Sequence, residues 1–364
     1  MLRGRIKSLD GLRGLACLPI VLVHYYGAAD AINGAGVREL PFAGILGPLY
    51  EYGYIFVYVF FWLSGFLCES RYKDNIKQLS IFSFIKKRMK KLYPMAFVSI
   101  TLGIVISFMD QVITGGMCVQ KPIKLWYIFL SYTFQQIGWV EQSWMMPYGS
   151  GGWFLCVLLL CYVLFWVINN LFDQNKYYFY VTIMFFIGWA AYSGNKEIPF
   201  FNVWNGSGYC GFFGGVLLYE LFYGDFCENT QRIKSIFNNW LFSAGLLCIL
   251  LGAVVLGGCS PVMVLVLYSP IMILYSLEVR WTKTLLELKG IQLLGRLSMS
   301  IYMSHAHVIN LISIILVYSR FPSSYRDSYF FFMVIISCII IGIIYYGLIE
   351  KRFVRLWNTY ISKD

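Results

Sequence analysis

The chain has 364 residues, of which 59% are apolar and only 13% are charged, against about 25% charged residues in an ordinary soluble domain. A globule of this size could not bury so much apolar surface, so lipid must be the solvent for most of it, which excludes a soluble globule, a disordered chain and a coiled coil. On such a chain the formal charge of +11 indicates membrane topology and contact with anionic lipid rather than a nucleic-acid partner.

Apolar windows of about 19 residues predict ten membrane spans in an all-α, polytopic helix bundle. The first is kept as a helix rather than a cleaved signal, because Arg13 lies at its entry and His24 interrupts its far end. The predicted spans are 12–28, 49–69, 92–110, 153–172, 178–193, 207–223, 239–257, 262–279, 293–318 and 329–349. The aromatic stretch 125–139 is broken by Gln135 and Gln136, so we expect it to be an outer, membrane-lying or re-entrant segment.

The charges support this map with both termini cytoplasmic. Of the 29 Lys and Arg residues, 23 then fall on the inner side and 6 on the outer side, as the positive-inside rule requires. The ten cysteines include no Cys-x-x-Cys pair, so we expect packing residues rather than disulfides or a metal site. Without a visible repeat or linker, residues 1–364 are predicted to form a single membrane domain with no soluble C-terminal domain.

Ionisable residues at membrane depth are costly and are usually tied to function. Arg13 and His24 are eleven positions apart, about 16 Å of helix rise, so Arg13 lies near the cytoplasmic surface and His24 near mid-membrane. His305 stands about twelve residues into its own span and reaches a similar depth. The two imidazoles are therefore candidates to line one cavity and move a proton. Core histidines bonded to backbone carbonyls are the structural alternative. His307, two positions on, should face another side of its helix.

The basic run 84–94 precedes the third predicted span. Arg88 and Lys91 share a helix face, and with Arg13 at the same level they would suit a phosphate-bearing ligand. On charge alone, a topogenic cluster resting on anionic headgroups explains the run better.

Three further residues are candidates for a supporting role. Ser64 stands with Gly65 in a span of bulky side chains, Trp153 opens another span, and Tyr302 shares a helix face with His305. On their own, Ser64 and Trp153 are better explained by close helix packing and interfacial anchoring than by a site.

Five strings, in order along the chain, resemble signatures of the acyltransferase-3 family of membrane acyltransferases. The family's hallmark is an arginine, ten residues and then a histidine, which Arg13 and His24 match. The strings are SLDGLRGLACLPIVLVH (8–24), FFWLSGFL (60–67), RMKKLYP (88–94), SIYMSH (300–305) and LIEKRF (348–353). The chain departs from the family at two positions. Lys91 replaces an arginine and loses the bidentate fork, and Leu158 stands where many members have a glutamate.

The resemblance implies an acyltransferase that moves an acyl group, commonly acetyl, from cytoplasmic acyl-CoA to a hydroxyl of a cell-surface polysaccharide or lipid-linked sugar. Arg13, Arg88 and Lys91 would then hold the CoA phosphates. His24 would act as general base, beside His305, or would carry the acyl group itself. Asp10, at the expected N-cap of the first helix, would fix the helix start or orient Arg13. Acetyl-CoA or another acyl-CoA is expected as co-substrate, with no metal and no nucleic-acid partner. The expected location is the bacterial inner (cytoplasmic) membrane, and the oligomeric state is left open.

Two functions of other classes remain as alternatives. A proton-coupled transporter or flippase for a glycan or lipid-linked intermediate would use His24 and His305 as proton carriers. It predicts inverted repeats and broken helices in corresponding halves, and the sequence shows neither. The second alternative is a non-catalytic membrane assembly factor.

Overall fold

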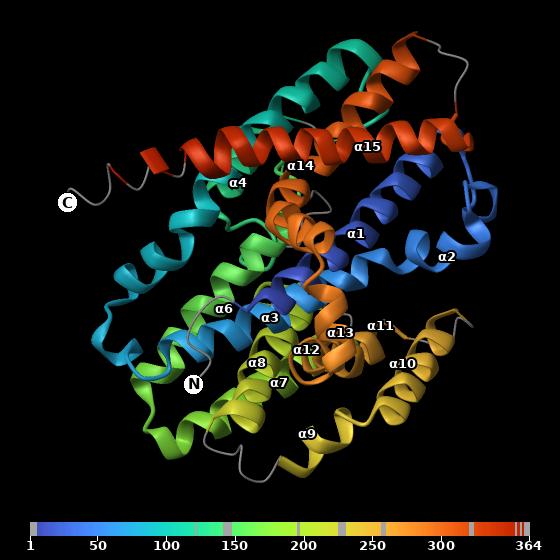
Figure 1. Ribbon diagram of the computed structural model, residues 1–364. Coiled ribbons are helices and arrows are strands. Elements are labelled where there is room, and N and C mark those ends of the chain that lie inside the picture. The colour runs from blue at the N-terminus through green and yellow to red at the C-terminus, as the bar shows by residue number, and fades with distance from the viewer. Residues whose placement is uncertain are drawn as a thin grey trace. The chain divides into compact units, whose positions relative to one another are not determined.

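The structure is a computed structural model that describes residues 6–119, 121, 123–140, 148–194, 197–224, 231–255, 260–319, 324–353, 355–356 and 359. Helices dominate it (Figure 1). The first part of the chain forms α1 (Lys7–Asn33), η1 (Val37–Glu39), α2 (Ala43–Tyr52), η2 (Gly53–Ile55), α3 (Phe56–Tyr72), η3 (Ile76–Gln78), α4 (Ile81–Thr114) and α5 (Leu125–Thr133). The middle forms α6 (Gly152–Leu171), α7 (Gln174–Gly194), β1 (Glu197–Ile198), β2 (Phe201–Asn202), α8 (Val203–Tyr223), α9 (Gln231–Phe237) and α10 (Trp240–Val255). The last part forms α11 (Pro261–Met263), the π-helical turn η5 (Val264–Tyr268), α12 (Ser269–Glu278), α13 (Arg280–Leu286), α14 (Lys289–Ser319), α15 (Ser328–Tyr345) and the π-helical η6 (Tyr346–Phe353).

The predicted all-α membrane fold is confirmed. Among the described residues, seven stretches are long and apolar enough to cross a membrane: Lys7–Asn33, Ala43–Tyr72, Leu92–Thr114, Gly152–Leu171, Pro261–Glu278, Lys289–Ser319 and Ser328–Arg352. The three other predicted spans fall on α7, α8 and the shorter α10. The only strands in the described part of the chain are β1 and β2, which pair antiparallel over two residues each. The nine-residue α5 is too short to cross a bilayer, consistent with the non-spanning segment expected at 125–139.

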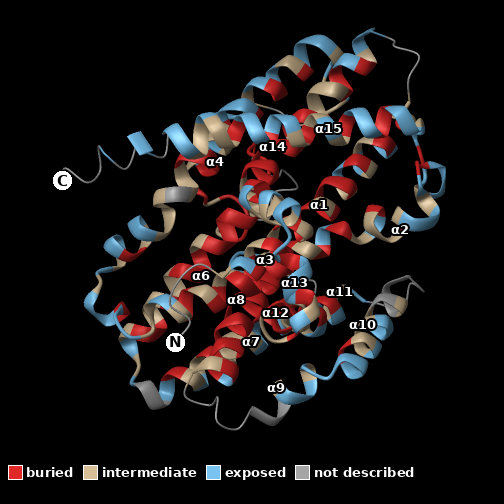
Figure 2. Ribbon diagram, in the orientation of Figure 1, coloured by how far each residue is buried: buried red, intermediate tan, exposed pale blue. Residues whose placement is uncertain are grey.

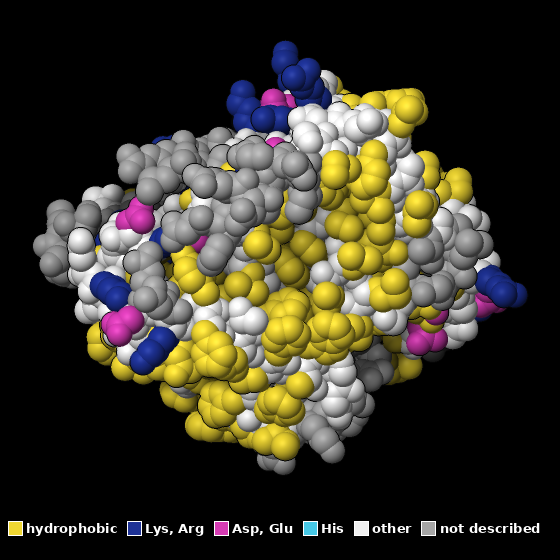
Figure 3. Space-filling model, turned by 90° about the horizontal axis from the view of Figure 1, so that it is seen from below, with side chains coloured by type: hydrophobic (Ala, Val, Ile, Leu, Met, Phe, Trp, Pro, Cys, Tyr) yellow, Lys and Arg dark blue, Asp and Glu magenta, His cyan; other side chains and the backbone are white. Residues whose placement is uncertain are grey.

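The outer surface of these helices suits lipid. Figure 3 shows apolar side chains over much of one face, with charged groups near its edges. Large apolar residues such as Ile336, Ile340 and Ile343 on α15 are exposed, whereas buried side chains collect on the inward sides of the helices (Figure 2). The eight cysteines in the described residues are free thiols, and six of them are buried, as expected of packing residues.

The helices form two compact units. The first comprises Met1–Ala16, Ile55–Ile85 and Val157–Arg296, and the second comprises Cys17–Tyr54, Lys86–Cys156 and Leu297–Asp364. The boundaries fall inside α1, η2, α4, α6 and α14, so neither unit is a continuous stretch of chain. The single domain expected from the sequence stays a prediction.

The core of the first unit is built by α3, α7 and α8. At Gly65 an added Cβ would lie 1.8 Å from the carbonyl oxygen of Phe212, so only a glycine lets α3 approach the backbone of α8 this closely. The Trp62 indole donates to the carbonyl oxygen of Leu265 at 2.8 Å and ties α3 to η5. Asn202 caps α8 by accepting from the amides of Trp204 and Asn205. Gly65 of the FFWLSGFL string is thus a packing residue in this unit.

A buried polar network joins the same three helices. Glu69 on α3 and Glu220 on α8 are 0% and 1% exposed, and the two carboxyl groups lie within electrostatic reach of each other. The Lys73 ammonium lies 2.8 Å from Glu220 Oε2, and the Tyr177 hydroxyl donates to Glu69 Oε2 at 2.7 Å. One ammonium balances only one of two buried carboxylates, so the network is neutral when Glu220 pairs with Lys73 and Glu69 carries a proton.

This charge count predicts different costs for two amide substitutions. Glu69→Gln should leave stability nearly unchanged, since an amide can still accept from Tyr177 and is as uncharged as a protonated carboxyl group. Glu220→Gln should cost about 1–3 kcal/mol, because Lys73 then loses its counter-charge. Thermal melts of both variants in detergent check this, and a larger loss in Glu69→Gln would contradict a protonated Glu69.

The second unit gathers the rest of α1 with α2, α4, α5, α14 and α15 (Figure 1). The Tyr25 hydroxyl donates to the carbonyl oxygen of Tyr325 at 2.6 Å, and Tyr345 donates to the carbonyl oxygen of Met95. The Ser300 hydroxyl donates to Glu350 at 3.0 Å and so ties α14 to η6. Segments far apart in the sequence are therefore fixed to one another by hydrogen bonds that hydroxyl groups donate.

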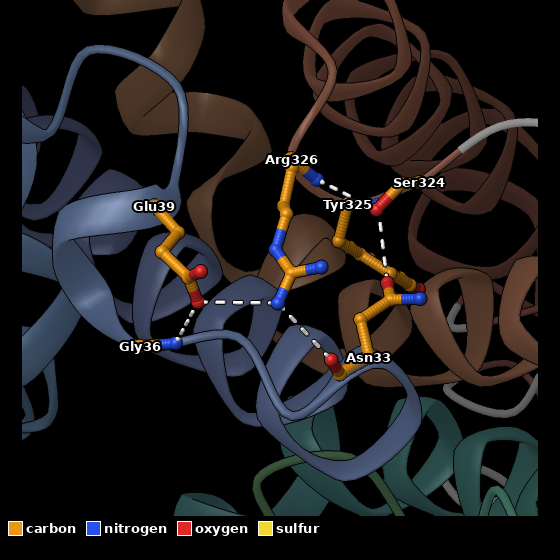
Figure 4. A network of polar contacts seen from close by, with 6 residues as sticks. All are labelled: Asn33, Gly36, Glu39, Ser324, Tyr325 and Arg326. Atoms are coloured by element: carbon orange, nitrogen blue, oxygen red, sulfur yellow. Dashed lines mark hydrogen bonds and ion pairs between the residues drawn. The ribbon is translucent and has the colours of Figure 1, made fainter.

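A surface network closes one end of this unit (Figure 4). The Arg326 guanidinium lies 3.2 Å from Glu39 Oε2 and also donates to the carbonyl oxygen of Asn33, and the Gly36 amide donates to Glu39 at 2.8 Å. The Gly36 amide and Arg326 lower the pKa of Glu39. The network links the end of α1 to the segment before α15. Its stabilising effect is present above the ordinary glutamate pKa and is lost as the pH falls through the lowered one.

Candidate active site

Two membrane-crossing helices of the second unit bring His24 and His305 together. His24 lies on α1 and His305 on α14, and their ring centroids are 4.9 Å apart with the planes inclined at 63°. Both helices are long and apolar, so each histidine is carried to membrane depth by its own span. The pair predicted from matched depth is thus in direct contact, whereas its chemical role stays a prediction.

His305 is held in one tautomer by its own helix. Its Nδ1 lies 3.1 Å from the carbonyl oxygen of Ile301, which can only accept, so Nδ1 carries the proton. Nε2 then carries the lone pair, and it is buried with no hydrogen-bond partner among the described residues. A buried base nitrogen with an unused lone pair is a ready proton or hydrogen-bond acceptor.

The two rings differ in access. His305 is only 1% exposed, whereas His24 is exposed. A general base must come within about 2.6–3.2 Å of the proton that it removes. His24 is therefore the ring that a substrate can reach, and His305 is the ring behind it.

His307 turns to another side of α14, as expected, and is bound there. Its Nε2 lies 2.9 Å from the Ser99 hydroxyl, which donates its own proton to the carbonyl oxygen of Met303 at 2.8 Å. Nε2 also accepts from the Ser150 amide at 3.4 Å. The Ser150 amide also donates to Ser99, at 3.0 Å. His307 is a satisfied core histidine that ties α14 to α4.

Ser150 connects this network to the histidine pair. Its hydroxyl donates to the carbonyl oxygen of Tyr302 at 2.8 Å and lies 3.4 Å from His305 Nδ1. The Tyr302 ring is buried 5.9 Å from the His305 ring and packs edge-on against Phe154. Trp153 lies half-buried in the first turn of α6. Ser150, Tyr302 and the start of α6 thus support the back of His305.

The predicted CoA-binding residues divide between the two units. Arg13 belongs to the first unit, where it lies 3.5 Å from Asp10. Arg88, half-buried, and Lys91 lie on α4 in the second unit, and the side chain of Lys91 is outside the described part of the structure. A common phosphate site for Arg13, Arg88 and Lys91 stays a prediction.

One expectation about supporting residues needs correction. Asp10 is not the N-cap, because α1 begins at Lys7 and places Asp10 in the first helical turn, facing Arg13. Ser64 belongs to the first unit, and its hydroxyl donates to the carbonyl oxygen of Phe60 in its own helix at 2.7 Å, so its supporting role stays a prediction. Such a bond satisfies a serine within a membrane helix without any ligand.

The comparison with known families bears on this arrangement. The acyltransferase-3 model, described as an acyltransferase domain, matches residues 6–347 of the 364. The chain belongs to the acyltransferase-3 family. It is therefore a multi-pass membrane acyltransferase, and membership favours an enzyme over the transporter and assembly-factor alternatives. No curated protein and no solved structure gives a significant match.

The sequence did not single out Ser99 and Ser150. Serines are common in membrane helices, and nothing in the sequence shows that these two converge on α14. The one available signal was the glycine-rich run at 149–152, where the chain passes close to another element.

Proposed function

We propose that this enzyme transfers an acyl group, most simply acetyl, from cytoplasmic acyl-CoA to a hydroxyl of a cell-surface polysaccharide or lipid-linked sugar at the bacterial inner membrane. The proposal rests on one observation: the exposed His24 ring lies against a buried histidine whose Nε2 lone pair is unused. Such a pair suits proton transfer to and from a hydroxyl near neutral pH.

In this mechanism His24 is the general base. It takes the proton of the acceptor hydroxyl as the oxygen attacks the thioester carbonyl carbon. The carbon–sulfur bond of the tetrahedral intermediate then breaks, and the thiolate takes the same proton from His24. While His24 is an imidazolium, its N–H can turn toward His305 Nε2, because the centroids of the two rings are 4.9 Å apart. His305 would thereby stabilise the charge without itself meeting the substrate.

The donor would enter from the cytoplasmic end of α4. Arg88 lies in the second turn of that helix, within the basic run, and its guanidinium suits a phosphate or pyrophosphate of CoA. The pantetheine arm would then carry the thioester toward mid-membrane.

This donor assignment predicts unequal effects within the basic run. Arg88→Ala should raise the acyl-CoA concentration needed for half-maximal rate by about ten-fold or more, because a charged contact to phosphate is lost. Arg88→Lys should weaken binding, whereas Lys91→Arg should preserve or improve it, since only arginine has the bidentate fork. Calorimetry with CoA and dephospho-CoA measures both. The nearby Lys86→Ala is the control, and equal binding by all variants would mean that the run is only topogenic.

The function itself is tested with purified protein and radiolabelled acetyl-CoA, by release of CoA and transfer of label to sugars. Glycan mass spectrometry of cells with and without the gene identifies the acceptor. Rapid acid quench distinguishes direct transfer from a relay, because only the relay leaves label on the protein at His24. No CoA release and no change in glycan mass would refute the proposal.

A further inference from the structure

A loop lysine faces the histidine cluster from the end of α4. Lys121 is half-buried and lies within electrostatic reach of His24 on α1 and of His307 on α14. Both histidines are carried by neighbouring helices. None of the family-like strings contains this residue. The cluster therefore includes a cation that neither the proton transfer nor the donor site uses.

The loop that carries Lys121 is fixed to α4 by side-chain bonds. Asp110, 1% exposed, accepts from the amides of Cys118 and Val119 at 3.1 and 2.8 Å. Gln111 donates to the carbonyl oxygen of Lys121 itself at 3.0 Å. Because the buried Asp110 carboxylate accepts from these loop amides, it holds the backbone of the segment in one place. The position of Lys121 is therefore fixed by the fold.

Burial also tunes the charge of this residue. It lowers the pKa of the Lys121 ammonium to about 8, so the side chain is a poorly hydrated cation at neutral pH. A cation that has lost part of its hydration shell gains more from an anionic ligand than an exposed lysine does.

Lys121 and the predicted donor residues lie at opposite ends of α4. Arg88 is near the start of the helix, and Lys121 follows its end at Thr114. The 26 residues from Arg88 to Thr114 rise about 39 Å, roughly the thickness of a bilayer with its interfaces. A ligand that contacts both Lys121 and His24 therefore comes from the side opposite to CoA.

We propose that Lys121 is the binding site for an anionic group, a carboxylate or a phosphate, on the acyl acceptor. The proposal rests on the proposed function, because it assumes that the hydroxyl to be acylated approaches His24. A lysine is a point charge and suits either anion, so an acidic sugar and a phosphorylated sugar share the required chemistry.

Binding to the purified full-length protein tests this without relying on turnover. The probes are glucuronate, glucose 1-phosphate and uncharged glucose, each at matched ionic strength, and the readout is the shift in melting temperature. An anionic probe should stabilise the wild type, and glucose should not. Lys121→Gln and Lys121→Met should weaken that binding by about ten-fold or more, and Lys121→Arg should retain it. Whichever anionic probe binds distinguishes a carboxylate from a phosphate acceptor.

Lys124 provides the matched control on the same loop. It is exposed and lies 5.5 Å over the Tyr127 ring, so Lys124→Gln removes one charge from the loop without touching the cluster. It should leave probe binding unchanged. The stabilisation should fall as the pH rises through about 8 in the wild type, because Lys121 loses its proton, and should persist in Lys121→Arg.

Equal binding by Lys121→Gln and the wild type, or no stabilisation by either anionic probe, overturns the proposal. These outcomes are separate from the failure of the proposed function. A protein that binds an anionic sugar through Lys121 but never releases CoA from acetyl-CoA would keep the anion site and lose the acyl transfer.

Discussion

His24→Ala should lower the rate of acyl transfer by about 10²- to 10⁴-fold while leaving a folded, membrane-inserted protein. The ring is exposed, so its loss leaves little unfilled core, and its contact with His305 is a ring contact rather than a structural bond. Transfer of radiolabel from acetyl-CoA, at equal expression and with melting temperatures checked, measures the effect. Near-normal transfer by a well-folded variant would refute the role of His24.

Two glutamine variants of α14 separate the histidine pair from the core network. His305→Gln should keep part of the activity, since an amide can bond to Ile301 and to His24 but cannot share a proton. Its pH–rate profile should also change, which a purely structural loss would not produce. His307→Gln is the matched control: its amide can still bond to Ser99, so activity should change little. The reverse order of effects would place the chemistry at His307.

Much of the fold could be predicted because lipid imposes a simple rule. A span must be apolar and about 20 residues long, so hydropathy alone located helices for all ten predicted spans. The start of α1 was misjudged because Asp10 is a good N-cap residue and composition does not reveal that the helix already begins at Lys7. The π-helical turns η5 and η6 have no comparable sequence signal.

The site was only partly predictable, for a related reason. Depth along a span follows from residue counting, and it placed His24 and His305 at one level. Rotation about the helix axis and the choice of neighbours depend on packing, which counting does not show. The bond that His305 donates to Ile301 and the convergence of Ser99 and Ser150 on α14 are of that kind. Lys121 was counted only as one of six outer charges, because nothing in its loop sequence indicates that it turns inward.

The second large effect on activity is expected from a substitution of Gly151, which packs against Tyr302 behind the histidine pair. This residue has φ +66°, and an added Cβ would lie 2.1 Å from the Tyr302 ring. Tyr302 is buried against Phe154 and cannot move aside freely. Gly151→Ala should therefore cost about 1–2 kcal/mol of backbone strain and a further ~1–3 kcal/mol of overpacking. It should also slow transfer by about 10²-fold, because Tyr302 and Ser150 support His305 and small displacements of a base are costly.

Gly34 separates strain from packing, since it has φ +56° but nothing within 4 Å of an added Cβ. Gly34→Ala should show the strain alone, a loss of about 1–2 kcal/mol in thermal melts with activity retained.

Combining Gly151→Ala with Tyr302→Ser should relieve the clash between the added methyl group and the ring. The double variant should therefore lose less stability than the sum of the two single losses. Strictly additive losses would mean that Gly151 does not act through Tyr302. Gly151→Ala would then act through a displaced Ser150 hydroxyl, and Ser150→Ala should in that case reproduce the loss of activity.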